Sequence, residues 1–287
     1  MINLFKNYIN WHIKNLVKLF TDNLYKKNED SYVKLFNFIF WFKGINDRIK
    51  YNNKENRFII KNSEIAFVFK NKKQGVHSYK NGLDARAKEI GKAYMLNEID
   101  FFENDFVVDC GANVGDLLLY FKHKNFKINY LGIEPSPEEH SCLEINAKDY
   151  THSNIGLWNK KAEKTFFISS DGADSSLITP STFDSKIDIK CDRLDNLLSD
   201  NKNVKLLKLE AEGAEPEVLD GASTILRNIE YISADLGPER GVDNLETYSE
   251  VTNLLYKNDF SLIKINPDRL SVLYKNNKYY GKHSNNR

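Results

Sequence analysis

The feature that most constrains the fold is a change of pattern after Asn104. From there, short apolar stretches typical of strands alternate with segments of helical pattern. The apolar stretches are residues 106–110, 128–134, 204–210, 229–235 and 260–266. Parallel neighbours in a sheet need a long crossover, which is usually a helix. The alternation therefore predicts an α/β domain whose mostly parallel sheet carries helices on both faces.

The N-terminal part of the chain follows a different pattern. Apolar residues recur three or four apart in residues 4–24 and 32–42, which predicts two helices. Two β-prone runs, residues 58–61 and 65–69, flank a polar turn and predict a hairpin, after which residues 82–97 are typical of a helix. A chain of 287 residues can hold one large α/β core and an accessory segment. We therefore predict an N-terminal helical and hairpin extension over residues 1–80 and the α/β domain over residues 81–287.

Composition narrows the range of partners and compartments. The formal net charge is +1, so no chain-wide positive field favours nucleic acid as a partner. The three cysteines are too far apart for a zinc or disulfide framework. No apolar run is long enough to span a bilayer, and we predict a cytoplasmic protein. Lysines near the first two helices allow contact with a membrane surface, but packing on the chain's own domain or on a sister chain in a homo-oligomer is favoured.

A cofactor site is predicted where the strand at 106–110 enters a glycine-containing turn. Glycines permit close backbone approach at the carboxyl edge of the sheet, where open α/β folds bind ligands. Glu134 ends the next strand, and its carboxylate can accept hydrogen bonds from both hydroxyls of a ribose. The predicted cofactor-binding residues are Asp109, Gly111, Ala112, Asn113, Gly115, Glu134, Pro135 and Ser136.

The glycine spacing separates two kinds of cofactor. A dinucleotide fingerprint needs G-x-G-x-x-G, whereas this loop has only Gly111 and Gly115, so pyrophosphate fits poorly. The carboxylate of Asp109 favours a cationic amino-acid group and opposes a phosphate. Both observations favour S-adenosylmethionine. A nicotinamide-dependent oxidoreductase and a non-catalytic binding protein that keeps the cofactor fold are the alternatives.

Several motifs in the same order resemble the FkbM-type family of S-adenosylmethionine-dependent methyltransferases, from about residue 81 to residue 274. The motifs are residues 108–115, 132–137, 174–177, 193–195, 207–215 and 235–241. The resemblance implies a class I methyltransferase fold, which is Rossmann-like and has a seven-stranded sheet whose last strand runs antiparallel. It also implies O-methylation of sugars, polyketides or other natural products, often in surface-polysaccharide pathways. One departure is Glu210, where the family commonly has Asp.

Candidate catalytic residues follow from the chemistry of such a transfer. A sulfonium methyl group is already activated, so the enzyme mainly aligns the reactants, while a hydroxyl acceptor also needs a base. Glu210 and Glu212 lie at the carboxyl end of a predicted strand and are the candidates for that base or for positioning the acceptor. Together with Glu215 they could instead hold a divalent cation. Three acids spread over a strand, a turn and a helix more often diverge, and Glu215 could simply favour its helix N-terminus, so no metal is predicted.

The acceptor pocket is predicted from two further segments. Its candidate residues are Ser175, Ser176, Asp235, Glu239 and Arg240. Arg240 could bind an anionic group of the substrate or form an internal ion pair with Glu239, and the two serines could instead cap the turn before Leu177. Three histidines, His77, His140 and His152, are interpreted as isolated, and a lone histidine is more often a structural residue than a catalyst, so no role is predicted for them.

Overall fold

A computed structural model describes residues 23–169, 175–198 and 202–279 of the chain. The chain divides into two compact units, Met1–Arg86 and Ala87–Arg287. The boundary predicted from the sequence, between residues 80 and 81, stays a prediction. The predicted helix over residues 4–24 lies, up to residue 22, outside the described residues.

The described residues of the first unit form helices and a small antiparallel sheet. The helix predicted at 32–42 is confirmed as α2 (Glu29–Phe42), which follows the 3-10 turn η1 (Leu24–Lys26). The predicted hairpin is confirmed as β2 (Arg57–Lys61) and β3 (Ala66–Phe69), after which comes α3 (Lys72–Tyr79). A third strand, β1 (Arg48–Asn52), pairs with β2. β1 was not predicted, because only its Ile49 is buried and the strand has no apolar run.

The helix predicted over residues 82–97 is divided in the structure. It consists of α4 (Leu83–Ala93) and the 3-10 turn η2 (Leu96–Glu98). Between them Met95 has a φ of 53°, in the left-handed region, which ends the α-helix. None of the helices in the described parts of the chain combines the length and hydropathy needed to cross a membrane.

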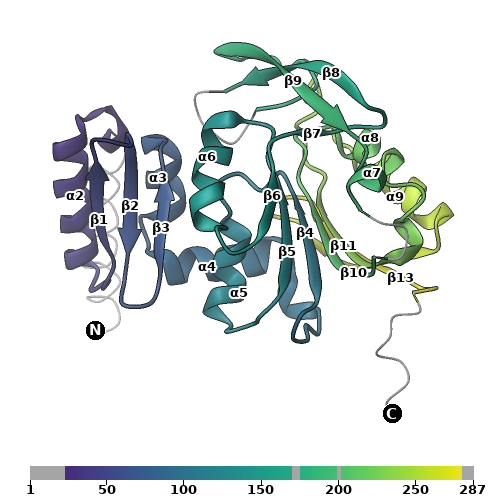
Figure 1. Cartoon of the computed structure of the whole chain (residues 1–287), viewed down its shortest axis with the longest axis horizontal. Helices are drawn as coiled ribbons and strands as arrows, with labels where there is room; N and C mark the ends of the chain where they lie inside the picture. The colour runs from purple at the N-terminus through teal and green to yellow at the C-terminus, as the bar shows by residue number, and fades with distance from the viewer. Residues whose placement is uncertain (1–22, 170–174, 199–201, 280–287) are drawn as a thin grey trace, which may run out of the picture. The chain divides into compact units, whose positions relative to one another are not determined.

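The second unit is built on a seven-stranded sheet (Figure 1). Its order is β12-β13-β11-β10-β4-β5-β6. The strands are β4 (Phe106–Cys110), β5 (Asn129–Ile133), β6 (Thr151–Ser153), β10 (Val204–Leu209), β11 (Ile229–Asp235), β12 (Phe260–Asn266) and β13 (Ser271–Asn276). Neighbours from β11 to β6 run parallel, whereas β13 is antiparallel to both β11 and β12. The predicted α/β fold, including its antiparallel last strand, is confirmed.

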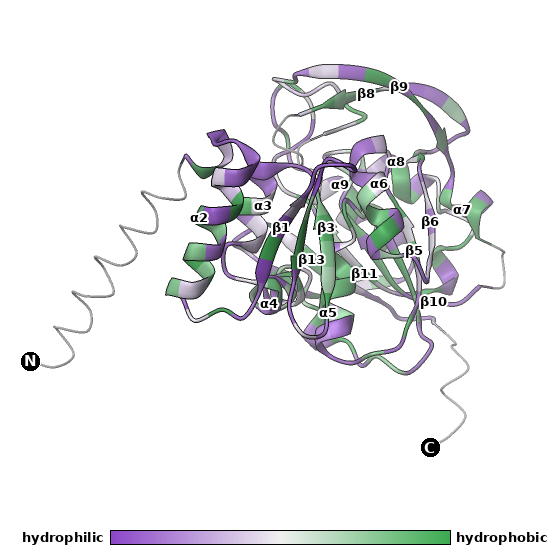
Figure 2. Cartoon of the chain, turned by 60° about the vertical axis from the view of Figure 1, so that its left-hand side comes forward, coloured by the Kyte–Doolittle hydropathy of each residue, from purple (hydrophilic) through white to green (hydrophobic). Residues whose placement is uncertain are grey.

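Two apolar layers cover this sheet, because alternate residues of one strand face opposite sides. On one side Val107 and Leu206 pack with α5 (Asp116–His123) and α6 (Pro137–Asn146). On the other, Val108 and Leu207 pack with α7 (Leu194–Leu197), α8 (Glu215–Asp220) and α9 (Tyr248–Lys257). The turn η3 (Leu226–Asn228) leads into β11. The inner strands are therefore mostly apolar, and green predominates along β11 in Figure 2.

A second sheet is inserted between β6 and β10. It consists of β7 (Gly156–Leu157), β8 (Ala162–Ile168) and β9 (Ser185–Asp192), in the order β7-β9-β8. The Ser176 hydroxyl, between β8 and β9, donates a hydrogen bond of 2.6 Å to the carbonyl of Glu212. This contact ties the inserted sheet to the loop that follows β10, at the carboxyl edge of the central sheet.

Candidate active site

The loop between β4 and α5 has the shape that the glycine pattern predicted. Gly111 and Gly115 have φ values of 70° and 93°, and Gly115 stands at the N-cap of α5. The backbone N–H groups of Gly111 and Ala112 each donate to the carbonyl of Ile133 at 3.0 Å. The loop is therefore fastened to the end of β5 and lies at the carboxyl edge of the sheet.

Position 111 requires glycine because the backbone of Glu210 passes very close to it. The effect of a larger residue on stability can therefore be predicted. A Cβ at this position would lie 2.0 Å from the carbonyl oxygen of Glu210. We expect Gly111→Ala to lower the free energy of unfolding by about 2–5 kcal/mol, from the positive φ and the steric overlap together. In the matched control Gly241→Ala, φ is 73° but the nearest atom is 3.8 Å away, so a loss of about 1–2 kcal/mol is expected. Urea unfolding measures the stability of both variants. Equal losses of stability would show that the backbone of Glu210 does not restrict position 111.

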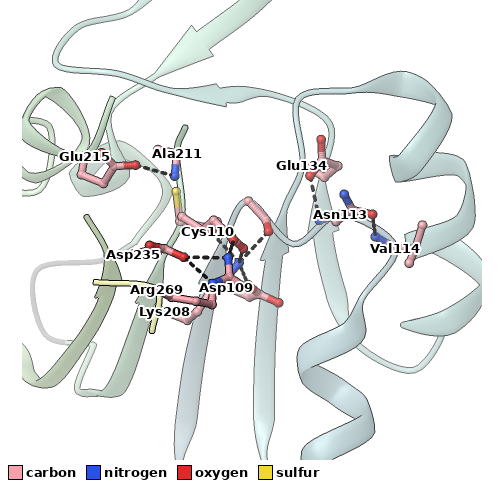
Figure 3. Close-up of polar contacts among 12 residues, drawn as sticks. Asp109, Cys110, Asn113, Val114, Glu134, Lys208, Ala211, Glu215, Asp235 and Arg269 are labelled. Carbon is pink, nitrogen blue, oxygen red and sulfur yellow. Dashed lines mark hydrogen bonds and ion pairs between the residues drawn. The ribbon is translucent and has the colours of Figure 1, made fainter. Parts of the chain in front are cut away.

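Glu134 is held beside this loop with its carboxylate already oriented (Figure 3). Its two oxygens accept backbone N–H groups from Asn113 at 2.7 Å and from Ser136 at 2.8 Å. Glu134 is 6% exposed, and burial raises its pKa to about 8 although the two hydrogen bonds oppose the shift. Each carboxylate oxygen has two acceptor positions, so each retains one for a ribose hydroxyl. The residues present therefore fit a nucleoside cofactor.

The neighbouring Ser136 and Pro135 form the start of α6. Ser136 is its N-cap, and the Ser136 hydroxyl donates to the Glu139 carboxylate. The carbonyls of Glu134 and Pro135 accept hydrogen bonds of 2.8 and 3.0 Å from the Asn154 side chain, which follows β6. These contacts fix the backbone on both sides of Glu134.

Asp109 lies deeper in the sheet than the sequence analysis assumed. Its carboxylate is 1% exposed, accepts a hydrogen bond of 2.7 Å from the Tyr130 hydroxyl and lies 3.1 Å from the Lys208 ammonium. Lys208 also lies 3.0 Å from Glu210 and donates to the carbonyl of Gly111 at 2.7 Å. The charge of Asp109 is therefore compensated within the protein. Its direct contact with a cofactor stays a prediction.

A second group of carboxylates gathers around Arg269, which the sequence analysis missed. The Arg269 guanidinium lies 3.0 Å from Glu210 and 2.7 Å from Asp235 (Figure 3 shows Arg269 with Asp235). Burial opposes the ionisation of Glu210, but Lys208 and Arg269 overcome it and lower its pKa to about 2. Glu210 is therefore held as an anion. The second carboxylate oxygen of Asp235 is buried without a hydrogen-bond partner.

Glu239 adjoins that unpartnered oxygen. A Cβ built on Gly237 would lie 3.5 Å from Asp235 Oδ1 and 3.6 Å from Glu239 Oε1, so both oxygens border the bare glycine. Burial, reinforced by the negative charges of Asp235, Glu210 and Glu215, raises the pKa of Glu239 to about 8. A carboxyl group with a pKa close to neutral is well matched to accept a proton from a reacting hydroxyl.

Arg240 forms an internal ion pair, but with a different partner from the one considered in the sequence analysis. Its guanidinium makes two hydrogen bonds to Glu217, of 2.7 and 2.9 Å, and donates to the carbonyl of Gly213. The pairing with Glu239 was therefore wrong, since Glu217 occupies the guanidinium. Binding of a substrate anion by Arg240 stays a prediction.

The remaining predicted residues hold the loops at this edge together. The Ser175 hydroxyl accepts from the Ser169 N–H, and Ser176 accepts from the Ile178 N–H while donating to Glu212, an arrangement that matches the turn-capping alternative. Glu212 has a φ of 50° in the turn after β10. Acceptor binding by the serines and catalysis by Glu212 stay predictions.

Glu215 is buried at the start of α8 and accepts from the Ala211 and Gly213 N–H groups and from Thr247. Within the described parts of the chain, the ligand atoms of Glu210, Glu212 and Glu215 do not gather at metal-ligand spacing. His140 and His152, however, do meet, with ring nitrogens 3.2 Å apart. Treating them as isolated was wrong, because α6 and β6 bring together residues that are distant in sequence.

The sheet order, the glycine loop and Glu134 define a class I methyltransferase fold, the class that uses S-adenosylmethionine as its cofactor. A family model described as the methyltransferase FkbM domain matches residues 109–262, which is more than half of the chain. The chain belongs to this FkbM methyltransferase family, so the resemblance predicted from its motifs is confirmed. The nicotinamide-dependent alternative is set aside.

Two curated relatives and one solved structure illustrate the similarity. Methyltransferase 1 of Beauveria bassiana is 28% identical over 163 residues, covering 47% of this chain and 65% of the relative. Methyltransferase sdnD of Sordaria araneosa is 26% identical over 188 residues, covering 50% and 71%. A TehB-like SAM-dependent methyltransferase from Corynebacterium glutamicum has a TM-score of 0.40 at 9% identity, covering 65% and 87%. The chain thus spans slightly less than two thirds of the Beauveria protein.

Proposed function

We propose that this chain is an S-adenosylmethionine-dependent O-methyltransferase that modifies a hydroxyl of a sugar, a glycan or a related small molecule, in surface-polysaccharide or natural-product biosynthesis. The observation that carries the proposal is Glu239, a half-buried carboxyl group whose pKa is raised to about 8 by partial burial and by the neighbouring negative charge of Asp235. A hydroxyl group is a weak nucleophile until its proton is removed, so a hydroxyl acceptor needs a base, whereas an acceptor such as a thiolate is already nucleophilic at neutral pH.

The residues of the site divide into two roles in this proposal. Bound S-adenosylmethionine supplies an activated methyl group. Glu134 would hold the ribose hydroxyls, and the loop from Gly111 to Gly115 would lie against the same cofactor. On the acceptor side, Glu239 would take the hydroxyl proton while Asp235 accepts a hydrogen bond from the acceptor. Alignment of the reacting atoms then provides most of the rate enhancement.

Glu210 and Glu212 keep narrower roles than the sequence analysis gave them. A carboxylate with a pKa of about 2 is a weak proton acceptor, so we assign Glu210 to the positioning of Arg269. Glu212 remains a candidate for contact with the acceptor, because its turn is tied to the inserted sheet through Ser176.

The compartment and the excluded partners are also part of the proposal. Cys110, Cys142 and Cys191 are buried free thiols, which suits the reducing cytoplasm. A net charge of +1 supports a small-molecule or glycan acceptor in preference to nucleic acid.

The test is transfer of a labelled methyl group from S-adenosylmethionine to a panel of acceptors. The panel contains nucleotide sugars, glycan extracts, small hydroxylated natural products and, as the contrasting arm, RNA. We expect label in a sugar or small-molecule fraction, stable to mild alkali as a methyl ether is, with a methoxy carbon signal in the NMR spectrum of the product. Label found only in RNA, or only as an alkali-labile methyl ester, would refute the proposal.

A further inference from the structure

A group of potential metal ligands lies apart from the carboxylates of the proposed acceptor site. His140 and Glu144 are four residues apart on α6, so their side chains share one face of that helix. His152 is the middle residue of β6, the edge strand of the central sheet. Within the described parts of the chain, these three residues are the set of His, Cys, Asp and Glu whose ligand atoms all lie within 4.8 Å of one another.

The packing of α6 on the sheet explains why His152 points toward the helix. His152 pairs in register with Gly132 of β5, and residues paired in this way project from the same face of a sheet. A Cβ built on Gly132 would lie 3.2 Å from Leu143 Cδ2 of α6, so this face is the one that α6 covers. The absence of a side chain at Gly132 lets the helix approach the sheet closely. His140 and His152 therefore meet across a fixed helix-to-strand contact.

The distance between the two rings suits a shared cation. His140 Nε2 and His152 Nδ1 are 3.2 Å apart. Two imidazole nitrogens bound to one tetrahedral zinc ion at about 2.0–2.1 Å stand about 3.3–3.4 Å apart, so the rings need almost no movement to bind it. A direct hydrogen bond between the rings explains the same distance, but it gives no role to the Glu144 carboxylate. A metal ion uses all three groups.

We propose that His140, Glu144 and His152 bind one zinc-class divalent cation. Imidazole nitrogen favours zinc and its neighbours among the transition metals, whereas magnesium and calcium favour sites made entirely of oxygen ligands. Three protein ligands leave a fourth position for water. The cation would clamp β6 to α6, next to the loop that carries Glu134, whose N–H donates to the carbonyl of Ser153 in β6. The site does not depend on the proposed methyl transfer.

The test is a zinc titration of the metal-stripped full-length chain, in competition with a chromophoric chelator. We expect one zinc ion per chain, no comparable binding of magnesium, and an affinity that falls about 100-fold in His140→Ala and in His152→Ala. The exposed Glu144 gives a milder variant, Glu144→Gln, in which the fold is not at risk and a loss of about tenfold is expected. Far-UV circular dichroism verifies that each variant is folded.

His123→Ala is the matched control, because it removes a histidine from the end of a different helix, α5. Its zinc affinity should equal that of the unmodified chain. The proposal is overturned if the chain binds no stoichiometric zinc, or if the double variant His140→Ala/His152→Ala binds zinc as tightly as the unmodified chain. Anomalous scattering from zinc-soaked crystals locates the ion directly, and a peak elsewhere alone would also overturn it.

Discussion

Replacing Lys208 by Met should lower the free energy of unfolding by about 3–5 kcal/mol, because it leaves the buried carboxylate of Asp109 without its counter-charge. The Lys208 side chain is 5% exposed and compensates Asp109, which is 1% exposed, together with Glu210. The methionine side chain is similar in length to the lysine side chain but carries no charge. Urea unfolding at pH 7, followed by circular dichroism, measures the loss.

An exposed lysine provides the control for this variant. The side chains of Lys264 and Glu98 form an ion pair while 51% and 42% exposed, so Lys264→Met should cost less than about 1 kcal/mol. The double variant Asp109→Asn/Lys208→Met should recover part of the lost stability, since it also removes the buried negative charge of Asp109. If Lys208→Met destabilises the protein no more than Lys264→Met, the buried ion group has been misinterpreted.

Glu239→Gln should reduce the rate of methyl transfer by about 10²- to 10⁴-fold, the usual contribution of a general base. The base must be ionised to accept a proton. With the pKa of Glu239 raised to about 8, the rate in the unmodified chain should rise with pH and level off above about 8. The variant should lose this rise. Initial rates between pH 6 and 10, measured with an acceptor found in the label-transfer assay, give both quantities.

Two further variants test whether Glu239 or another carboxylate is the base. Glu163 is exposed on β8, so Glu163→Gln should keep both the rate and the pH profile. Glu210→Gln should weaken acceptor binding through Arg269. Because the charge of Glu210 helps raise the pKa of Glu239, this variant should keep the pH-dependent rise but move it to lower pH. If the rise of the rate with pH disappears in Glu210→Gln and persists in Glu239→Gln, then Glu210 is the base and Glu239 is not. Binding of S-adenosylhomocysteine should be unchanged in Glu239→Gln.

The parts of the fold and of the site that could be predicted are those set by residues close together in the sequence. The buried strands around the glycine loop read as continuous apolar runs, and the positions of Gly111, Gly115 and Glu134 follow from the ends of those strands. The inserted sheet was missed because β9 alternates between exposed and buried residues and contains charges. The edge strand β6 was missed because it has only three residues and none of them is buried, so it has no apolar run.

The ion groups could not be predicted because they depend on the order of the strands. Lys208 meets Asp109 only because β10 lies next to β4, in a register that pairs these two residues. Arg269 reaches Glu210 from the turn between β12 and β13, at a sequence separation of 59 residues. One signal was present for Lys208, since a lysine within an otherwise apolar buried strand must have a buried partner.

The most direct test of the cofactor assignment is calorimetric titration with S-adenosylhomocysteine. The chain should bind one molecule, and Glu134→Ala should weaken binding about 10- to 100-fold because the hydrogen bonds with both ribose hydroxyls are lost. The exposed Glu138→Ala on α6 should bind as the unmodified chain does. NAD, titrated in parallel, should show no binding. Tight binding of NAD with none of S-adenosylhomocysteine would contradict the assignment of this site to S-adenosylmethionine.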